Sequence, residues 1–228
     1  MNEQPIDAVR GVGQPADSDS GPAVHPVVRH YTRSALLSSL LDALSAAGKS
    51  VAPIDSDDLS PMDEMHTGGR IATVCLADQL APSPGDTVID LGCGLGGVTR
   101  YLARHRECRV TGVDLTREHI EVADELTQRC GLTGAASFQR ADITSLPFER
   151  ESFDAAALLH VGMNVADKAS LCTEAFRVLR PGGRFALYDV MLRSSADELS
   201  YPVPWASSDR ISFLEPAEEY HRLLTNAG

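Results

Sequence analysis

The sequence predicts an α/β fold: a doubly wound, mainly parallel Rossmann-like sheet of five strands. Three observations predict it. After residue 86, short apolar runs alternate with amphipathic helical segments, as in chains whose parallel strands are joined by helices. The apolar runs show no polar alternation, as expected for strands covered by helices on both faces. The residues before position 87 are mostly helical in pattern.

The N-terminal part divides into a tail and the start of the domain. Residues 1–30 are rich in Pro, Gly, Asp and Ser, and we expect a mobile tail there. The domain itself is expected over residues 31–228. Its first helix is marked by leucines at helical spacing from Leu36 to Leu44, and Gly48 follows as a stop signal.

The remaining elements follow from changes in hydrophobic period and from Gly and Pro at the boundaries. In chain order they are a turn-rich stretch over 51–61, a helix over 70–81, a strand over 87–92, a helix over 95–105, a strand over 108–115, a helix over 117–130, strands over 136–142 and 153–161, a helix over 167–179, a turn over 180–183, a strand over 184–191 and a short helix over 216–226.

Composition excludes several classes of protein. The 228 residues suffice for one domain with its own core, and the net charge of −12 opposes binding to nucleic acid and to anionic membranes. No apolar run is long enough to span a membrane, and the first residues lack the apolar core of a signal peptide. The five cysteines form neither a CxxC pair nor a zinc-ligand spacing. We therefore expect a cytoplasmic protein with reduced thiols and no metal site.

The stretch VIDLGCGLGG, residues 88–97, carries the main chemical motif. Gly92, Gly94 and Gly97 satisfy the pattern GxGxxG between a strand and a helix. Such glycines allow a sharp turn and let a nucleotide lie against the backbone at the helix N-terminus. Asp114, at the end of the next strand, is placed to accept hydrogen bonds from two ribose hydroxyls.

Asp90 distinguishes between the nucleotides that this turn accommodates. A pyrophosphate beside its carboxylate would cost about 4 kcal/mol at ~4 Å and an effective dielectric near 20. The ammonium and sulfonium of S-adenosylmethionine (SAM) are favoured by the same charge. The alternative is a strand-end Asp that bonds only nearby backbone N–H groups. Asp142 and Ile143 end the third strand and are placed to contact adenine; a turn-capping Asp142 is the alternative.

Taken together, these motifs resemble those of class I SAM-dependent methyltransferases of type 11. The matching stretches are VIDLGCGLGG, VTGVDLT, RADITSLPF, FDAAALLHVGMN and RVLRPGGRFALYDVM. MDEMHTGGRIATVCLADQL, with LGCGLGG and HVGMN, is also similar to small-molecule methyltransferases of the sarcosine/dimethylglycine N-methyltransferase type. The resemblance implies methyl transfer from SAM to a nitrogen or oxygen of a small molecule by direct in-line displacement.

The resemblance also implies site residues. The implied cofactor contacts fall on Asp90, Gly92, Gly94, Gly96, Asp114, Leu115, Asp142, Ile143 and His160. The end of the fourth strand, from His160 to Asn164, would face the transferred methyl group. Met163 there is expected mainly to pack. A helical N-terminal lid would include Tyr31 and His66, with Tyr31, Met163 and Asn164 on the acceptor side.

Two histidines are the candidates for a general base. His160 and His66 carry imidazoles that titrate near neutral pH, and a hydrogen-bonded structural histidine is the alternative for each. Tyr31 and Trp205 would form an aromatic wall around a cationic amine, with core packing as an equal alternative.

The end of the chain departs from the family pattern. Complete members have two further strands that form an antiparallel hairpin, and this sequence stops at Gly228, where that hairpin would begin. We therefore expect a bare edge on the fifth strand, open to a second copy or to another partner. A truncated chain, a partnered subunit and a shortened enzyme all fit this expectation.

Two other functions stay open. An NAD-linked oxidoreductase rests on GxGxxG alone and is opposed by Asp90. A non-catalytic or weakly active SAM-fold protein, acting as an assembly partner, is the main alternative to an enzyme. RNA and protein substrates are disfavoured by the acidic charge and by LLHVGMN, which stands where such enzymes carry an Asn/Asp-Pro-Pro-aromatic motif.

Overall fold

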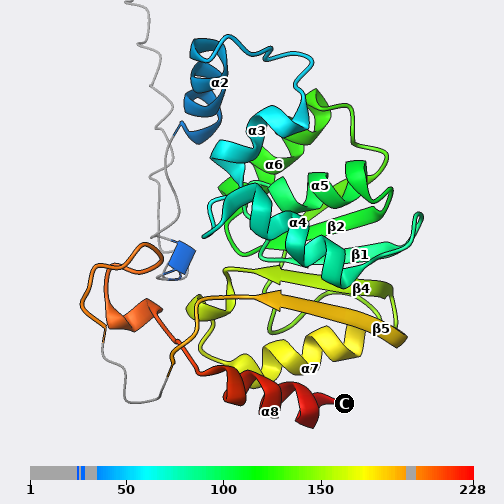
Figure 1. Cartoon of the computed structure of the whole chain (residues 1–228), viewed down its shortest axis with the longest axis vertical. Coiled ribbons are helices and arrows are strands. Elements are labelled where there is room, and N and C mark those ends of the chain that lie inside the picture. The colour runs from blue at the N-terminus through cyan, green and yellow to red at the C-terminus, as the bar shows by residue number, and fades with distance from the viewer. Residues whose placement is uncertain (1–24, 26, 29–34, 194–198) are drawn as a thin grey trace, which may run out of the picture.

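Five parallel strands form one sheet in the order β3-β2-β1-β4-β5 (Figure 1). They are β1 (Thr87–Leu91), β2 (Arg109–Asp114), β3 (Ala136–Arg140), β4 (Phe153–Leu159) and β5 (Leu179–Tyr188). The computed structural model describes residues 25, 27–28, 35–193 and 199–228. The predicted fold class is confirmed. The predicted tail, residues 25, 27 and 28 apart, and Tyr31 lie outside the described residues.

Helices cover both faces of the sheet. They are α2 (Leu36–Ala46), α3 (Ser56–Asp63), α4 (Gly69–Leu80), α5 (Gly97–His105), α6 (Arg117–Arg129), α7 (Lys168–Val178) and α8 (Ala217–Ala227), with short 3-10 helices η1 (Gly162–Asn164) and η2 (Asp209–Ile211). Helices α4, α5 and α6 lie on one face, and α7 lies on the other with α8 beside it (Figure 1). Helices α2 and α3 pack beyond α5 and α6, at the N-terminal end of the domain.

Each face of the sheet buries its own core. Val88 and Val110 pack with Leu102 of α5 on one face, whereas Ile89 packs with Leu171 of α7 on the other. Neighbouring strand residues therefore point into two different cores, and both positions must be apolar. This double burial explains why the strands read as continuous apolar runs without polar alternation.

The prediction of a turn-rich stretch over residues 51–61 is wrong in part. The turn-rich stretch over residues 51–61 forms, in its second half, the helix α3. Asp55 is its N-cap, with a carboxylate that accepts a hydrogen bond from the N–H of Asp57 at 3.0 Å. Asp57 and Asp58 lie in the first turn, where the helix dipole favours negative charge. Pro61 inside the helix and the low hydrophobicity of this stretch hid the helical pattern.

The fifth strand begins before its predicted start. Phe153 pairs with Leu179, but Ala155 pairs with Arg184, so the predicted turn over residues 180–183 is a bulge within β5. Among the described residues, β5 pairs along its length with β4 only, and most of its side chains are at least partly exposed. A second chain on this edge stays a prediction.

No helix in the described ranges has both the length and the apolar character that crossing a bilayer requires. All five cysteines are free.

Candidate active site

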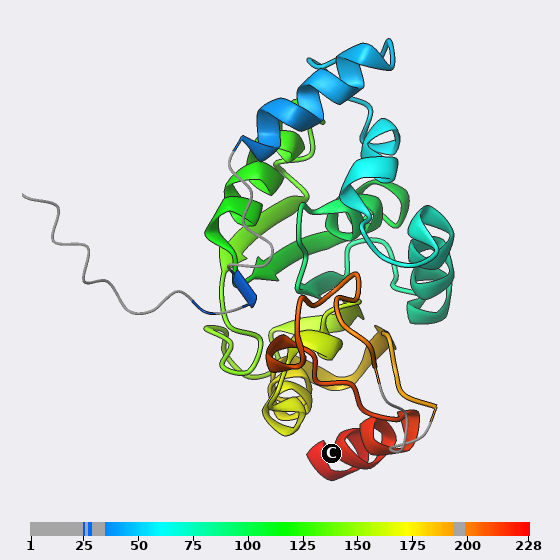
Figure 2. The ribbon, with the colours of Figure 1, turned by 90° about the vertical axis from the view of Figure 1, so that its left-hand side faces the viewer.

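A cavity of about 790 Å³ opens at the carboxyl ends of the strands, the side that Figure 2 presents to the viewer. Doubly wound sheets bind ligands at this edge, where the strand order reverses, and here the reversal lies between β1 and β4. The predicted site residues in the cavity wall are Asp90, Gly92, Gly94, Asp114, Leu115, Asp142, Ile143, His66, His160, Met163, Asn164 and Trp205. The structure thus brings together nearly all the predicted site residues that it describes.

The glycine loop between β1 and α5 shapes the inner end of the cavity. At Gly92 (φ +80°), a Cβ atom would lie 2.3 Å from the side chain of Val161, so no larger residue fits there. At Gly94, a Cβ atom would meet nothing within 4 Å, so the loop leaves open space for a ligand. Gly96 is not in the wall. A Cβ atom added at Gly96 would lie 2.7 Å from the guanidinium of Arg100. Gly96 therefore affects the site only indirectly, by allowing the loop to adopt its conformation.

Asp90 is a fully buried carboxylate at the end of β1. It accepts a hydrogen bond from the hydroxyl of Thr99 at 2.6 Å. Burial raises the pKa of Asp90 to about 6, and the nearby charge of Asp114 acts in the same direction. At neutral pH the cavity therefore holds a buried anion, which a cationic ligand would stabilise.

Asp114 connects the second strand to the glycine loop. Its Oδ2 accepts a hydrogen bond from the N–H of Gly94 at 3.0 Å, and its Oδ1 accepts one from the N–H of Thr116 at 2.8 Å. The ring of His119 lies 3.5 Å from the same carboxylate. Burial alone would raise the pKa of Asp114, but His119 and these N–H groups together lower it. Asp114 is therefore an anion at the cavity wall at neutral pH.

Asp142 and Ile143 line the cavity after β3. The Oδ1 of Asp142 accepts hydrogen bonds from the N–H and the hydroxyl of Thr144, at 2.9 and 2.7 Å. Asp142 thus has the turn-capping role that was considered for it, and it also lines the cavity.

The two predicted histidines lie together at the cavity. The ring centroids of His66 and His160 are 6.0 Å apart, and the ring of His160 also stacks on that of Tyr188 at 5.5 Å. His160 has a φ of +52°, a left-handed conformation that is costly for a residue with a side chain. Burial lowers the pKa of both histidines, and the neighbouring His66 further lowers that of His160. Both rings are therefore neutral at pH 7 and able to accept a proton.

Comparison with known proteins identifies the family. Residues 89–187 match the family described as "Methyltransferase domain". The methyltransferase GfsG of Streptomyces halstedii is 32% identical over 173 residues, which cover 75% of this chain and 62% of GfsG. An O-methyltransferase of Pyrenophora dematioidea is 28% identical over 172 residues, covering 75% of this chain and 64% of that protein. A geranyl diphosphate methyltransferase structure in complex with SAM gives a TM-score of 0.60 at 25% identity, over 68% of this chain and 63% of that chain.

The chain contains a methyltransferase domain of the class I SAM-dependent type over residues 89–187. It spans less than two thirds of the length of the two curated relatives above. The residues of this domain fit SAM, the methyl donor of the family. Asp90, Asp114 and Asp142 make the glycine-loop end of the cavity acidic, and Arg210 is the only Arg or Lys among the described lining residues. This wall suits a cationic ligand and opposes the diphosphate of a dinucleotide.

One wall of the methyltransferase cavity comes from the segment that follows residue 199. The side-chain amide of Asn164 donates hydrogen bonds to the carbonyls of Trp205 and Ile211, at 3.0 and 2.7 Å. Asn164, predicted on the acceptor side, thus holds this wall in place as well as lining the cavity. Met163 is 3% exposed and packs, as expected. The indole N–H of Trp205 donates to the hydroxyl of Ser212 at 3.1 Å.

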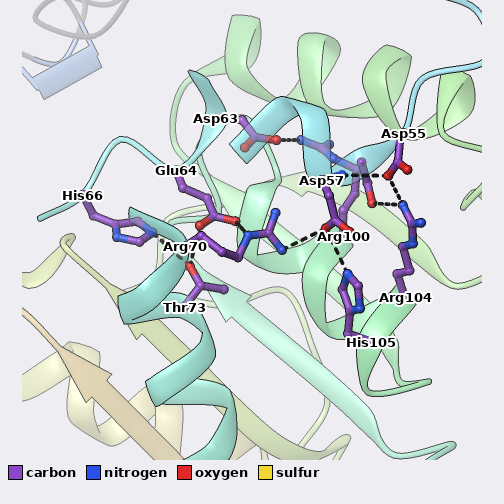
Figure 3. A network of polar contacts seen from close by, with 11 residues as sticks. Asp55, Asp57, Asp63, Glu64, His66, Arg70, Thr73, Arg100, Arg104 and His105 are labelled. Atoms are coloured by element: carbon purple, nitrogen blue, oxygen red, sulfur yellow. Dashed lines mark hydrogen bonds and ion pairs between the residues drawn. The ribbon is translucent and has the colours of Figure 1, made fainter. Parts of the chain in front are cut away.

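A polar network behind His66 was missed by sequence reasoning (Figure 3). The Nε2 atom of His66 lies 3.2 Å from the hydroxyl of Thr73, which donates a hydrogen bond to Oε2 of Glu64 at 3.0 Å. Arg70 places its Nε 3.0 Å from Oε1 of Glu64 and continues the network to Asp57. Glu64 and His66 both fall in the stretch MDEMH, but nothing in the spacing of Glu64 and Thr73 marks them as partners.

A second part of the network lies beneath the glycine loop. Arg100 of α5 is 1% exposed and donates to the carbonyl of Leu95 at 2.6 Å. It also donates to Asp63 of α3 at 2.5 Å and to the hydroxyl of Thr127 of α6 at 3.0 Å. One buried guanidinium thus joins the N-terminal helices, the glycine loop and α6. A surface role is the ordinary expectation for Arg, so the sequence did not indicate it.

Proposed function

We propose that this methyltransferase transfers the methyl group of SAM to an oxygen of a small-molecule acceptor. The observation that carries the proposal is the pair His66 and His160, which line the cavity with ring centroids 6.0 Å apart and are neutral at pH 7. A hydroxyl must lose a proton as it is methylated, and a neutral imidazole can take that proton. The O-methyltransferase among the relatives supports oxygen over nitrogen.

Named residues of the cavity would hold SAM. Asp90 suits the positively charged methionine portion, Asp114 the ribose hydroxyls, and Asp142 and Ile143 the adenine edge and ring. When bound, SAM supplies a methyl group on a positively charged sulfur, which an acceptor atom displaces in line. The residues of this chain need only exclude water, align the acceptor and accept one proton.

His160 is placed to align the acceptor beside His66. Its ring makes no hydrogen bond within the described part of the chain, and it lines the cavity. Its backbone N–H donates to the carbonyl of Tyr188 at 2.8 Å, and the ring stacks on the Tyr188 ring, so its position is fixed from both sides. A fixed ring in a strained backbone conformation is typical of residues kept for function. Trp205, which also lines the cavity, supplies apolar surface for the acceptor.

Methyl-labelled SAM incubated with a metabolite extract tests this proposal. We expect label in an extractable small molecule, joined through oxygen, and a loss of transfer of about 100-fold in His160→Asn. Label joined through nitrogen would make the acceptor an amine. If SAM binds and no extract yields a labelled product, the non-catalytic alternative is correct.

A second chain at the edge of β5 is a separate proposal, tested by the molar mass of the protein in solution. A cytoplasmic location stays a prediction.

A further inference from the structure

Thr73 links His66 to a buried carboxylate (Figure 3). Its hydroxyl donates a hydrogen bond to Oε2 of Glu64 at 3.0 Å, and the same oxygen lies 3.2 Å from Nε2 of His66. Thr73 is completely buried and Glu64 is 6% exposed, so water does not compete for the hydrogen bond between them. The three groups form a short chain that ends at the cavity.

The charge of Glu64 decides the direction of these hydrogen bonds. Arg70 places its Nε 3.0 Å from Oε1 of Glu64 and is itself held against Asp57 and the ring of Tyr101. Burial raises the pKa of Glu64, and the neighbouring carboxylates of Asp63 and Asp57 act in the same direction, whereas Arg70 and the Thr73 hydroxyl oppose them. With the guanidinium in contact, we expect Glu64 to be ionised at neutral pH.

Counting hydrogens then fixes the form of the imidazole. An ionised carboxylate only accepts hydrogen bonds, and a hydroxyl has a single hydrogen to donate. Because Thr73 gives its hydrogen to Glu64, its oxygen can only accept from Nε2 of His66. A neutral imidazole carries one N–H, so the hydrogen lies on Nε2 and the lone pair on Nδ1.

The Nδ1 atom of His66 is buried and has no partner of hydrogen-bond geometry within the described residues, although the Thr67 backbone lies close enough to the ring to raise its pKa. Buried polar atoms are normally paired, so a lone pair with no donor among the described residues, in a side chain that lines the cavity, is placed to accept from a bound acceptor. We propose that Glu64 and Thr73 are positioning residues that hold the hydrogen of His66 on Nε2 and so present the Nδ1 lone pair to the hydroxyl of the acceptor.

The proton balance is simple. The Nδ1 atom of His66 takes the hydroxyl proton, and the electron pair of the broken O–H bond stays on the acceptor oxygen, which uses it for the new bond to the methyl carbon. The ring becomes a cation. Its charge is favoured by Glu64 through Thr73, by Asp63 and by the backbone of Thr67, and disfavoured by burial and by any charge on His160. This step rests on the proposed function, but the position of the hydrogen on His66 is a property of the free protein.

Nitrogen-15 NMR of histidine-labelled protein without SAM tests the position of that hydrogen. The variant His66→Asn assigns the signals. We expect the Nε2–H form in the wild type and in Thr73→Ser, which keeps the hydroxyl. In Glu64→Gln, the amide oxygen would face Arg70 and the amide N–H₂ would face Thr73. The Thr73 hydrogen would then turn to Nε2, and the ring hydrogen would move to Nδ1. An Nδ1–H form in the wild type, or no change in Glu64→Gln, would overturn the proposal.

The pH dependence of methyl transfer separates this proposal from the proposed function. Glu64→Gln removes the negative charge that favours the imidazolium, so the acidic limb of kcat should move to lower pH and kcat should fall about tenfold. Thr73→Val should lower kcat with little change in SAM affinity, and Thr73→Ser should restore it. If methyl transfer occurs and these variants leave kcat and its pH profile unchanged, the positioning role is wrong and the function stands. If no acceptor is methylated, the proposed function fails, and the NMR result still decides the form of His66.

Discussion

The carboxylate of Asp114 accepts a hydrogen bond from the backbone N–H of Gly94 at 3.0 Å. Asp114, at the end of β2, therefore holds the glycine loop that follows β1. The ends of β1 and β2 are thus joined by a hydrogen bond at the cofactor end of the cavity. The same carboxylate accepts from Thr116 at the start of α6, so three segments meet at one side chain.

Replacing Asp114 by Ala should weaken SAM binding by about 1–3 kcal/mol, because the ribose loses a charged acceptor and the glycine loop loses its anchor. Calorimetric titration of SAM measures this. Asp124→Ala, the same change at an exposed position of α6 outside the cavity wall, is the matched control and should bind SAM as the wild type does. Equal affinity in the Asp114 and Asp124 variants would remove Asp114 from the cofactor site.

The affinity for SAM should fall as the pH is lowered through about 6. Burial raises the pKa of Asp90 to about 6 in the free protein, so the carboxylate is ionised above that pH and becomes neutral below it. Only the ionised form attracts the cationic cofactor. With a single group of this pKa, binding at pH 5 should be about tenfold weaker than at pH 7.

Histidines in the cavity wall also respond to pH and must be controlled. His66 and His160 gain positive charge as the pH falls, which also opposes SAM. Asp90→Asn keeps an oxygen that can accept from Thr99 but lacks the charge, so it isolates the carboxylate. We expect weaker binding at pH 7 and a flatter pH dependence in this variant. A pH dependence as steep as that of the wild type would assign the effect to the histidines.

His160 should be more important for turnover than for folding. Its φ of +52° is a conformation that Asn tolerates better than Ala. We expect both His160→Asn and His160→Ala to lose methyl transfer. The Asn variant should retain about 0.5–1 kcal/mol more free energy of unfolding than the Ala variant, because Ala adopts the left-handed conformation at greater cost. Urea denaturation measures the difference, and a more stable Ala variant would contradict the assigned strain.

Removing the buried guanidinium of Arg100 should destabilise the protein strongly. In Arg100→Met, the carboxylate of Asp63 would be left buried without its cation, at a cost of about 3–5 kcal/mol. The double variant Asp63→Asn, Arg100→Met should recover part of this loss, because no unpaired charge remains. Additive losses in the double variant would show that the two side chains act independently.

The fold and the cofactor end of the cavity could be predicted because both depend on local pattern. Apolar runs and glycines mark the strand ends, and the carboxyl ends of parallel strands meet at one edge, so Asp90 and Asp114 had to lie together. Glu64, Thr73 and Arg100 could not be predicted in the same way. Their roles depend on contacts between α3, α4 and α5. A single sequence does not show whether a polar side chain is buried or exposed.

Calorimetric titration of the purified protein with SAM and, separately, with NADH decides whether this cavity is a SAM site. Saturable binding of one SAM per chain is expected, weakened by Asp114→Ala, with no binding of NADH because its diphosphate would lie beside Asp90. Tighter binding of NADH than of SAM, or no SAM binding at pH 7.5, would contradict the assignment of this cavity as a SAM site.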